Sequence, residues 1–172
     1  MRVIQIIGQP GAGKTTLVVD LIEALTSKGL SVGSIKHTAH SYELDKPGKD
    51  SHRHRVAGAS PAAMVNGAMA AVYLPREEGK DPMDTLLELY KGLDLVIIEG
   101  WISGPYPKFE VWRKATERAP ISSSQAVVNV VGLVSDDEVK GDVPLFSRGN
   151  LKGLQTRILQ MVEENSTEIV EK

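Results

Sequence analysis

The sequence contains no cysteine, which excludes disulfide bonds, thiol catalysis and cysteine-based zinc or iron–sulfur sites. It also has no strong excess of charge of one sign. The formal net charge is −2, so no basic field favours nucleic acid or a membrane surface as a partner. No apolar run is long enough to span a bilayer, and no signal peptide precedes the first glycine-rich segment. We therefore expect a cytoplasmic protein with no nucleic-acid partner and no membrane partner.

What the chain does contain is a glycine-rich segment directly after its first apolar run. The segment reads Gly8-Gln9-Pro10-Gly11-Ala12-Gly13-Lys14-Thr15-Thr16. This is the G-x-x-x-x-G-K-[ST] phosphate-binding loop between a strand and a helix. Its backbone N–H groups would form a nest for phosphate oxygens, and side chains at the glycine positions would obstruct that approach. Lys14 would reach the β- and γ-phosphates, and the Thr15 hydroxyl would ligate Mg²⁺. The whole segment is therefore a candidate nucleotide site.

The rest of the chain alternates strand and helix signals. Apolar and β-branched runs predict strands, and helical spacing predicts helices. The strands are expected at 1–7, 31–35, 93–99, 108–113 and 127–134, and the helices at 15–28, 50–59, 83–90 and 151–162. Two short β-like runs, 62–65 and 69–73, flank Asn66-Gly67, which is typical of a hairpin turn.

This order of elements predicts an α/β protein: a three-layer P-loop NTPase fold with a mostly parallel sheet and an antiparallel hairpin extension. The length of 172 residues is enough for one domain with its own core. We expect that single nucleotide-binding domain over residues 1–165. The polar end of the chain, residues 166–172, should form a frayed tail.

A carboxylate at the end of an apolar strand is the usual partner of a phosphate loop, because it holds Mg²⁺ or its water shell. Asp94 precedes and Glu99 follows the apolar run 95–98 of the strand expected at 93–99, and the two acids lie roughly 16 Å apart at about 3.3 Å per residue. The phosphate loop follows the carboxyl end of its own strand. In a parallel sheet Glu99 then lies on the phosphate side, and Asp94 lies at the far edge. We predict that Thr15 and Glu99 hold the metal.

Further candidates follow other strand and turn signals. Lys36 and His37 come after the strand expected at 31–35, and ligands of open α/β sheets bind at the carboxyl ends of strands. Lys49 and Asp50 lie beside a Pro-Gly turn in a locally basic stretch, which favours an anion-binding rim. The candidate catalytic residues are Lys14, Glu99 and Asp50.

The histidines leave an alternative open. Four of them fall within eighteen residues, beside two aspartates. The group is His37, His40, His52 and His54, with Asp45 and Asp50. Such a cluster could bind a metal, as in nickel-handling phosphate-loop GTPases. We favour phosphate-facing or surface histidines, because no tight pair has a supporting hydrogen-bond partner that the sequence identifies.

With these elements placed, the chain resembles the molybdopterin-guanine dinucleotide biosynthesis adapter protein B (MobB) family. The matching blocks cover most of residues 1–150 in the family's order. They are Gly8–Thr15, Ile-Lys-His-Thr-Ala-His at 35–40, Asp-Lys-Pro-Gly-Lys-Asp-Ser at 45–51 with Ala-Gly-Ala at 57–59 behind it, Ile-Ile-Glu-Gly at 97–100, Pro-Lys-Phe-Glu at 107–110 and Val-Ser-Asp at 134–136. The block at 45–51 is the most specific, because general phosphate-loop proteins do not have it.

The resemblance implies a homodimer that binds GTP with Mg²⁺ and hydrolyses it weakly. Such a protein would assist the molybdenum cofactor guanylyltransferase, which joins GMP to molybdopterin. The sequence has no Asn-Lys-x-Asp guanine motif, so the preference for guanine comes from the family alone. An ATP-dependent small-molecule kinase, with residues 41–50 as its acceptor lid, and a metallochaperone GTPase remain the alternatives.

Guanine presents an N1–H and an exocyclic amine, two donors that one carboxylate accepts together. A carboxylate that reads the base should follow a strand beside the phosphate strand. The strand expected at 127–134 ends in Ser135-Asp136-Asp137, so Asp136 and Asp137 are the candidates. The alternative is that both acids cap or solvate the turn before Val143.

Overall fold

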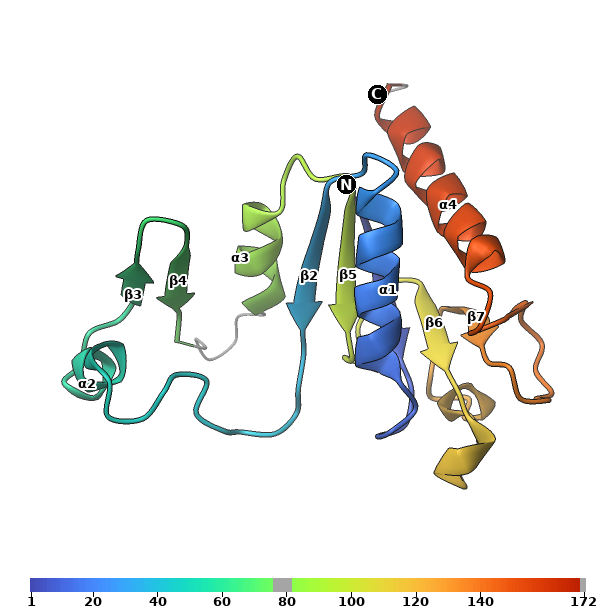
Figure 1. The fold of residues 1–172 in the computed structure, drawn as a ribbon, viewed down its shortest axis with the longest axis horizontal. Helices are drawn as coiled ribbons and strands as arrows, with labels where there is room; N and C mark the ends of the chain where they lie inside the picture. Colours follow the sequence, from blue (N-terminus) through green and yellow to red (C-terminus); the bar gives the residue numbers. More distant parts are fainter. Residues whose placement is uncertain (76–81, 171–172) are drawn as a thin grey trace. The chain divides into compact units, whose positions relative to one another are not determined.

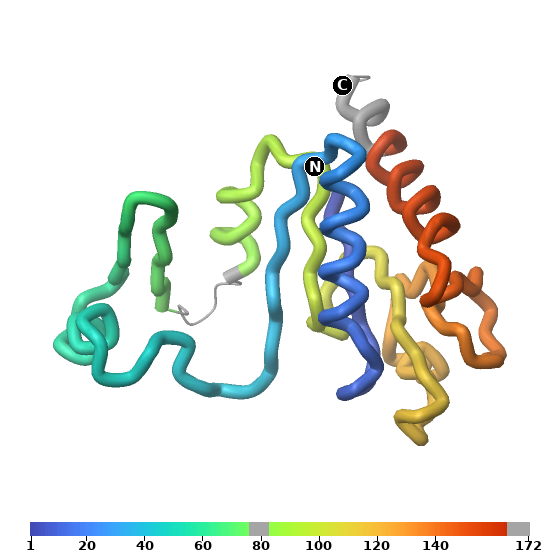
Figure 2. The backbone as a smooth tube through the Cα atoms, viewed as in Figure 1, coloured from blue at the N-terminus to red at the C-terminus, as the bar shows by residue number. Residues whose placement is uncertain are grey.

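The structure, a computed structural model, describes residues 1–75 and 82–170, without the side chains of 82 and 165–170. The chain forms two compact units: Met1–Ala39 with Tyr90–Lys172, and His40–Leu89. Figure 2 follows the backbone from the N-terminus in blue to the C-terminus in red. No helix in the described ranges is long and apolar enough to cross a membrane.

The first unit is built on a six-stranded sheet in which every pair of neighbours is parallel (Figure 1). Its order is β2-β5-β1-β6-β7-β8. The strands are β1 (Arg2–Ile7), β2 (Val32–Lys36), β5 (Leu95–Glu99), β6 (Lys108–Val111), β7 (Val130–Val134) and β8 (Leu145–Phe146). The first strand is therefore central, and the phosphate loop leaves its carboxyl end between β5 and β6.

The helices α1 (Lys14–Thr26) and α4 (Lys152–Val170) contact each other and β1. Strand alternation sends Ile4, Ile6 and Phe109 into the core that these helices share. The same alternation turns Gln5 and Lys108 to the opposite face, where both are fully buried. Two short 3₁₀ helices follow β6: η1 (Lys114–Thr116) and η2 (Ile121–Ser123).

The second unit contains α2 (Asp50–Val56), the antiparallel pair β3 (Ala62–Val65) and β4 (Ala70–Tyr73), and α3 (Pro82–Leu89). The hairpin turns at Asn66, whose side-chain oxygen accepts hydrogen bonds from the backbone N–H groups of Ala68 and Met69. The predicted fold class, a parallel α/β sheet with helices and an antiparallel hairpin, is confirmed.

Several element ends differ from the sequence prediction. The strand β7 starts at Val130 instead of 127, because Asn129 has a φ of 61°, which breaks an extended run. The strand β8 was not predicted, since two residues show no alternation. The predicted end of the last helix at Val162 is wrong: α4 continues to Val170, and no glycine or proline after Gly153 stops it. The single domain over 1–165 stays a prediction, and residues 171–172 of the expected tail lie outside the described residues.

Candidate nucleotide site

The phosphate loop has the backbone geometry of an anion nest. Gly8 has a φ of 148°, and a Cβ at this position would collide with the carbonyl oxygen of Val111 on β6. Gly13, the N-cap of α1, is left-handed with a φ of 94°. A side chain is strained at both positions, and the helix behind the loop directs the positive end of its dipole to the same place. The loop is therefore built for backbone contact with an anion.

Lys14 lies folded back over this loop. Its ammonium donates hydrogen bonds of 2.9 Å to the carbonyl oxygens of Gly8 and Gln9. Partial burial lowers the pKa of Lys14, and the nearby positive charge of Lys36 lowers it further, while Glu99 acts in the other direction. A bound polyphosphate would add negative charge beside this ammonium and would relieve both unfavourable effects.

Glu99 connects the phosphate loop to the end of the sheet. Its side chain is buried, and Oε1 accepts a 2.8 Å hydrogen bond from the Thr15 hydroxyl. The same oxygen pairs with the Lys36 ammonium, because the parallel register sets Lys36 beside Glu99. Asp94 lies at the other end of β5, where it accepts hydrogen bonds from the backbone N–H and hydroxyl of Ser31. The strand direction that separates the two acids is thus the predicted one.

The oxygen pair at Thr15 and Glu99 fits Mg²⁺. A hydroxyl and a carboxylate from two different elements meet within hydrogen-bond distance, and both are hard ligands of the kind that Mg²⁺ prefers. Within residues 1–75 and 82–170, no group of three or more His, Asp and Glu side chains is arranged to hold a metal. The assignment of Thr15 and Glu99 to a metal stays a prediction.

A cavity of about 350 Å³ lies on the β6–β7 side of the phosphate loop. Its lining residues are Ala12, Gly13, Thr16, Trp112, Arg113, Asp136, Asp137 and Arg148. It therefore joins the end of the phosphate loop to the two aspartates predicted to read the base. Its place beside Gly13 and Thr16 is suited to the nucleoside part of a nucleotide whose phosphates occupy the loop.

The two aspartates differ in their surroundings. Asp136 Oδ1 accepts hydrogen bonds from the Ser147 hydroxyl at 2.7 Å and the Gly149 N–H at 3.1 Å. These bonds lower the pKa of Asp136. Asp137 Oδ2 accepts a 2.8 Å bond from the backbone N–H of Lys114. Asp136 thus fixes the turn after β8, at Ser147 and Gly149, and not the turn before Val143 that the alternative named. Asp137 is the better-placed acceptor for a ligand, and its role in reading the base stays a prediction.

The other predicted site residues are distributed over both units. His37 belongs to the first unit, where its ring stacks on Trp101 with 5.7 Å between centroids and 22° between planes. Lys49 and Asp50 belong to the second unit, where they form the N-cap and first residue of α2 and are exposed. Their participation in a nucleotide site stays a prediction, as do the catalytic roles of Lys14, Glu99 and Asp50.

Several residues at the site were missed from the sequence. Trp112 donates a 2.8 Å hydrogen bond from Nε1 to the carbonyl of Arg118, and the Arg118 guanidinium reaches the Gln9 side chain at 3.5 Å. Arg148 lines the cavity and pairs with Asp20 of α1. No local motif distinguishes these arginines, because their positions depend on loops that follow β6 and β8.

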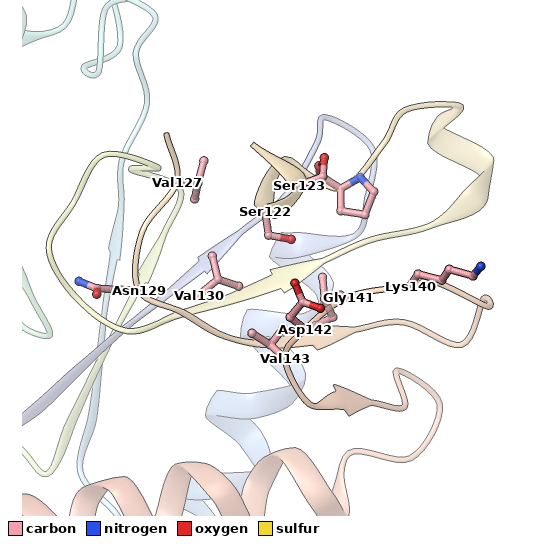
Figure 3. A pocket seen from close by; sticks show the side chains of 11 residues that line it. Ser122, Ser123, Val127, Asn129, Val130, Lys140, Gly141, Asp142 and Val143 are labelled. Atoms are coloured by element: carbon pink, nitrogen blue, oxygen red, sulfur yellow. The ribbon is translucent and has the colours of Figure 1, made fainter. Parts of the chain in front are cut away.

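A larger cavity, about 530 Å³, lies elsewhere in the first unit (Figure 3). Its lining includes Asn129 and Val130 at the start of β7 and Val143 before β8. These are the amino ends of parallel strands, opposite to the edge that holds the phosphate loop. Volume alone therefore does not identify the nucleotide site.

The chain is similar to known proteins of one family. The profile of a family described as "Molybdopterin guanine dinucleotide synthesis protein B" (MobB) matches residues 3–136. A molybdopterin-guanine dinucleotide biosynthesis adapter protein of Escherichia coli (strain K12) is 32% identical over 166 residues, which cover 91% of this chain and 90% of that relative. A probable adapter protein of the same name from Bacillus subtilis (strain 168) is 32% identical over 136 residues, 77% of this chain and 75% of the relative.

Solved structures agree in fold. The crystal structure of Bacillus subtilis MobB aligns with a TM-score of 0.74 at 22% identity, covering 94% of this chain and 98% of that one. A MobB homolog from Bacillus stearothermophilus aligns with a TM-score of 0.69 at 24% identity, covering 95% and 99%.

Proposed function

Because the chain belongs to the molybdopterin guanine dinucleotide synthesis protein B (MobB) family, we propose that it is a GTP-binding adapter in molybdenum cofactor biosynthesis. In this proposal it binds GTP with Mg²⁺ and assists a molybdenum cofactor guanylyltransferase, which attaches GMP to molybdopterin. The relatives are named as biosynthesis adapters for molybdopterin-guanine dinucleotide, which supports this pathway.

The observation that supports nucleotide binding most strongly is the contact between Thr15 and Glu99 beside the left-handed Gly13. In the proposal, the loop N–H groups and Lys14 hold the phosphates, since backbone donors and an ammonium complement their charge. Thr15 and Glu99 hold Mg²⁺, which would supply charge neutralisation at the phosphates. The cavity beside Gly13 and Asp137 takes the guanosine.

Hydrolysis should be slow in this arrangement. Glu99 already accepts from Thr15 and pairs with Lys36, so its carboxylate would hold the metal and the lysine instead of taking a proton from water. A weak GTPase of this kind would serve the transfer reaction mainly by binding and presenting ligands.

The β3–β4 hairpin supports the homodimer that we propose. It exposes Met64, Val65 and Val72, whose exposed fractions are 50%, 77% and 55%. Apolar side chains on a short two-stranded sheet are a common surface for association with a second copy.

The test is a reconstituted transfer reaction with a purified guanylyltransferase, molybdopterin and Mg·GTP, with and without this protein. We expect faster formation of the guanine dinucleotide when the protein is present. No acceleration at any concentration would contradict the adapter role. Transfer of phosphate from ATP to a small molecule by this protein alone would support the kinase alternative.

A further inference from the structure

Trp101, directly after Glu99-Gly100, has a backbone conformation that non-glycine residues rarely adopt. Its φ is 60°, and such a left-handed residue persists only where its surroundings hold it. The carbonyl of Trp101 accepts a 2.6 Å hydrogen bond from the Gln5 side-chain amide and a 3.0 Å bond from the Gly104 N–H. Gln5 lies on the central strand and is fully buried. The sheet itself therefore holds the unusual conformation.

Lys108 completes this support. Its side chain is fully buried, and its ammonium donates to the carbonyl oxygens of Gly104 and Tyr106. The register sets Lys108 beside Gln5 on neighbouring strands. A Cβ at Gly104 would lie 2.7 Å from the Trp101 indole. Burying an ammonium is unfavourable unless its hydrogen bonds are satisfied, and here they fix the turn that carries Trp101.

The result is an aromatic stack at the functional edge of the sheet. The Trp101 indole lies against the His37 imidazole, and Tyr106 packs edge-on against the indole at 6.2 Å. The backbone N–H of His37 donates to the backbone carbonyl of Glu99 at 2.9 Å, so the stack adjoins the acid that approaches Thr15. Both His37 and Trp101 are half-buried.

The stack and the 350 Å³ cavity lie on opposite sides of the phosphate loop. The cavity is on the β6–β7 side of the loop. The stack is on the other side, because His37 comes after β2 and Trp101 comes after β5. A nucleotide with its phosphates in the loop and its base in the cavity would leave the stack for a second ring. Lys36 adds a partly exposed ammonium there, which suits a second ligand with an anionic group.

We propose that the His37–Trp101 stack binds the pterin ring of the second substrate, with Gln5 and Lys108 as positioning residues. This inference rests on the proposed function, which supplies a pterin acceptor. Aromatic side chains bind planar heterocycles by stacking, without a demand for one hydrogen-bonding pattern. Pterin and guanine have related fused rings, so the experiment must separate a pterin site from a second guanine site.

The experiment measures two ligands by calorimetry, neopterin monophosphate and Mg·GTP, on the full-length protein. We expect Trp101→Leu to weaken neopterin monophosphate binding roughly tenfold and to change GTP affinity less than about twofold. Trp101→Phe keeps an aromatic ring and should retain most of the pterin affinity. Trp112→Leu is the reciprocal variant: it lines the cavity and should weaken GTP without affecting the pterin.

Gln5→Leu and Lys108→Met should lower pterin affinity as Trp101→Leu does, and their circular dichroism should show a folded chain. Neopterin monophosphate that fails to bind the wild type, or binds Trp101→Leu equally well, would overturn the inference. Equal losses of pterin and GTP in Trp101→Leu would also overturn it, since the stack would then hold guanine. If the wild type does not bind GTP, the proposed function fails. The titration with neopterin monophosphate still tests the pterin site, because the two ligands are measured independently.

Discussion

Lys14 is the residue whose removal should separate binding from folding most cleanly. Its ammonium donates to two carbonyl oxygens of its own loop, so Lys14→Ala should leave the fold intact. Loss of its charge-assisted bonds to phosphate should weaken GTP binding roughly a hundredfold. Calorimetry would measure this, with Lys28→Ala, a surface lysine paired with Gln155, as the control. GTP binding within a few-fold of wild type in Lys14→Ala would refute the phosphate-loop assignment.

Base recognition should depend on Asp137 more than on Asp136. Asp136 Oδ1 accepts hydrogen bonds from Ser147 and Gly149, whereas Asp137 Oδ2 accepts one from the backbone N–H of Lys114. Asp137→Ala should therefore reduce the preference for GTP over ATP roughly ten- to hundredfold, the cost of leaving ligand donors unpaired. The measurement is a competition titration of the two nucleotides. If the GTP-to-ATP ratio stays at the wild-type value in both Asp137→Ala and Asp136→Ala, neither carboxylate reads the base.

The sequence was sufficient to predict Gly8–Thr16 and the side of the sheet on which Glu99 lies. A motif identifies the first, and parallel strand direction gives the second. It was not sufficient to predict that Lys36 pairs with Glu99, because that contact depends on the register of β2 against β5. It also could not separate Asp136 from Asp137, since the donors Ser147 and Gly149 lie beyond an unpredicted strand.

At the scale of elements, Asp136 connects the end of β7 to the turn before α4. Its pKa lies below the ordinary value of 3.8, first because of the Ser147 hydrogen bond. A carboxylate with a lowered folded-state pKa stabilises the fold above its unfolded-state pKa. That contribution is lost as the pH falls through the lower, folded-state value.

We therefore predict that stability against urea decreases as the pH falls below about 5 in both proteins. The decrease should be steeper in the wild type than in Asp136→Asn. The asparagine keeps an acceptor for Ser147 and Gly149 but has no proton to gain. The urea midpoint, followed by circular dichroism from pH 7 downward, measures the difference. Parallel pH curves for the two proteins would show that Asp136 does not couple the turn to pH.

The sequence predicted helices and strands well where the apolar pattern was long, and it failed at the ends of some of these elements. The strands β1 and β5 and the helix α1 have continuous apolar patterns, and the Asn66-Gly67 turn marks the hairpin. The start of β7 depends on the left-handed Asn129, which no propensity indicates. The end of α4 could not be predicted because residues 163–170 contain neither glycine nor proline to mark where the helix stops.

At the scale of the whole molecule, the hairpin should control association. Register places Val65 and Val72 on one face of β3–β4, and both are more than half exposed. Val65→Glu with Val72→Glu should raise the dimer dissociation constant at least roughly a hundredfold, if each valine is buried between copies. Analytical ultracentrifugation measures this. Leu145→Glu on β8, at a side chain 52% exposed, is the matched control. If it raises the dissociation constant as much as the hairpin variant does, the hairpin is not the dimer interface.

The central claim is that the phosphate loop and Glu99 together form a Mg·GTP site. The most direct measurement is GTP binding by calorimetry, with and without Mg²⁺, on wild type, Glu99→Gln and Asp94→Asn. Glu99→Gln keeps the shape and removes the charge, so Mg²⁺ should no longer increase affinity, while Mg-free binding stays near the wild-type value. Asp94→Asn, at the far end of the same strand, should behave as wild type. If Mg²⁺ increases GTP affinity equally in all three proteins, or in none, Glu99 is not part of the metal site and the account is contradicted.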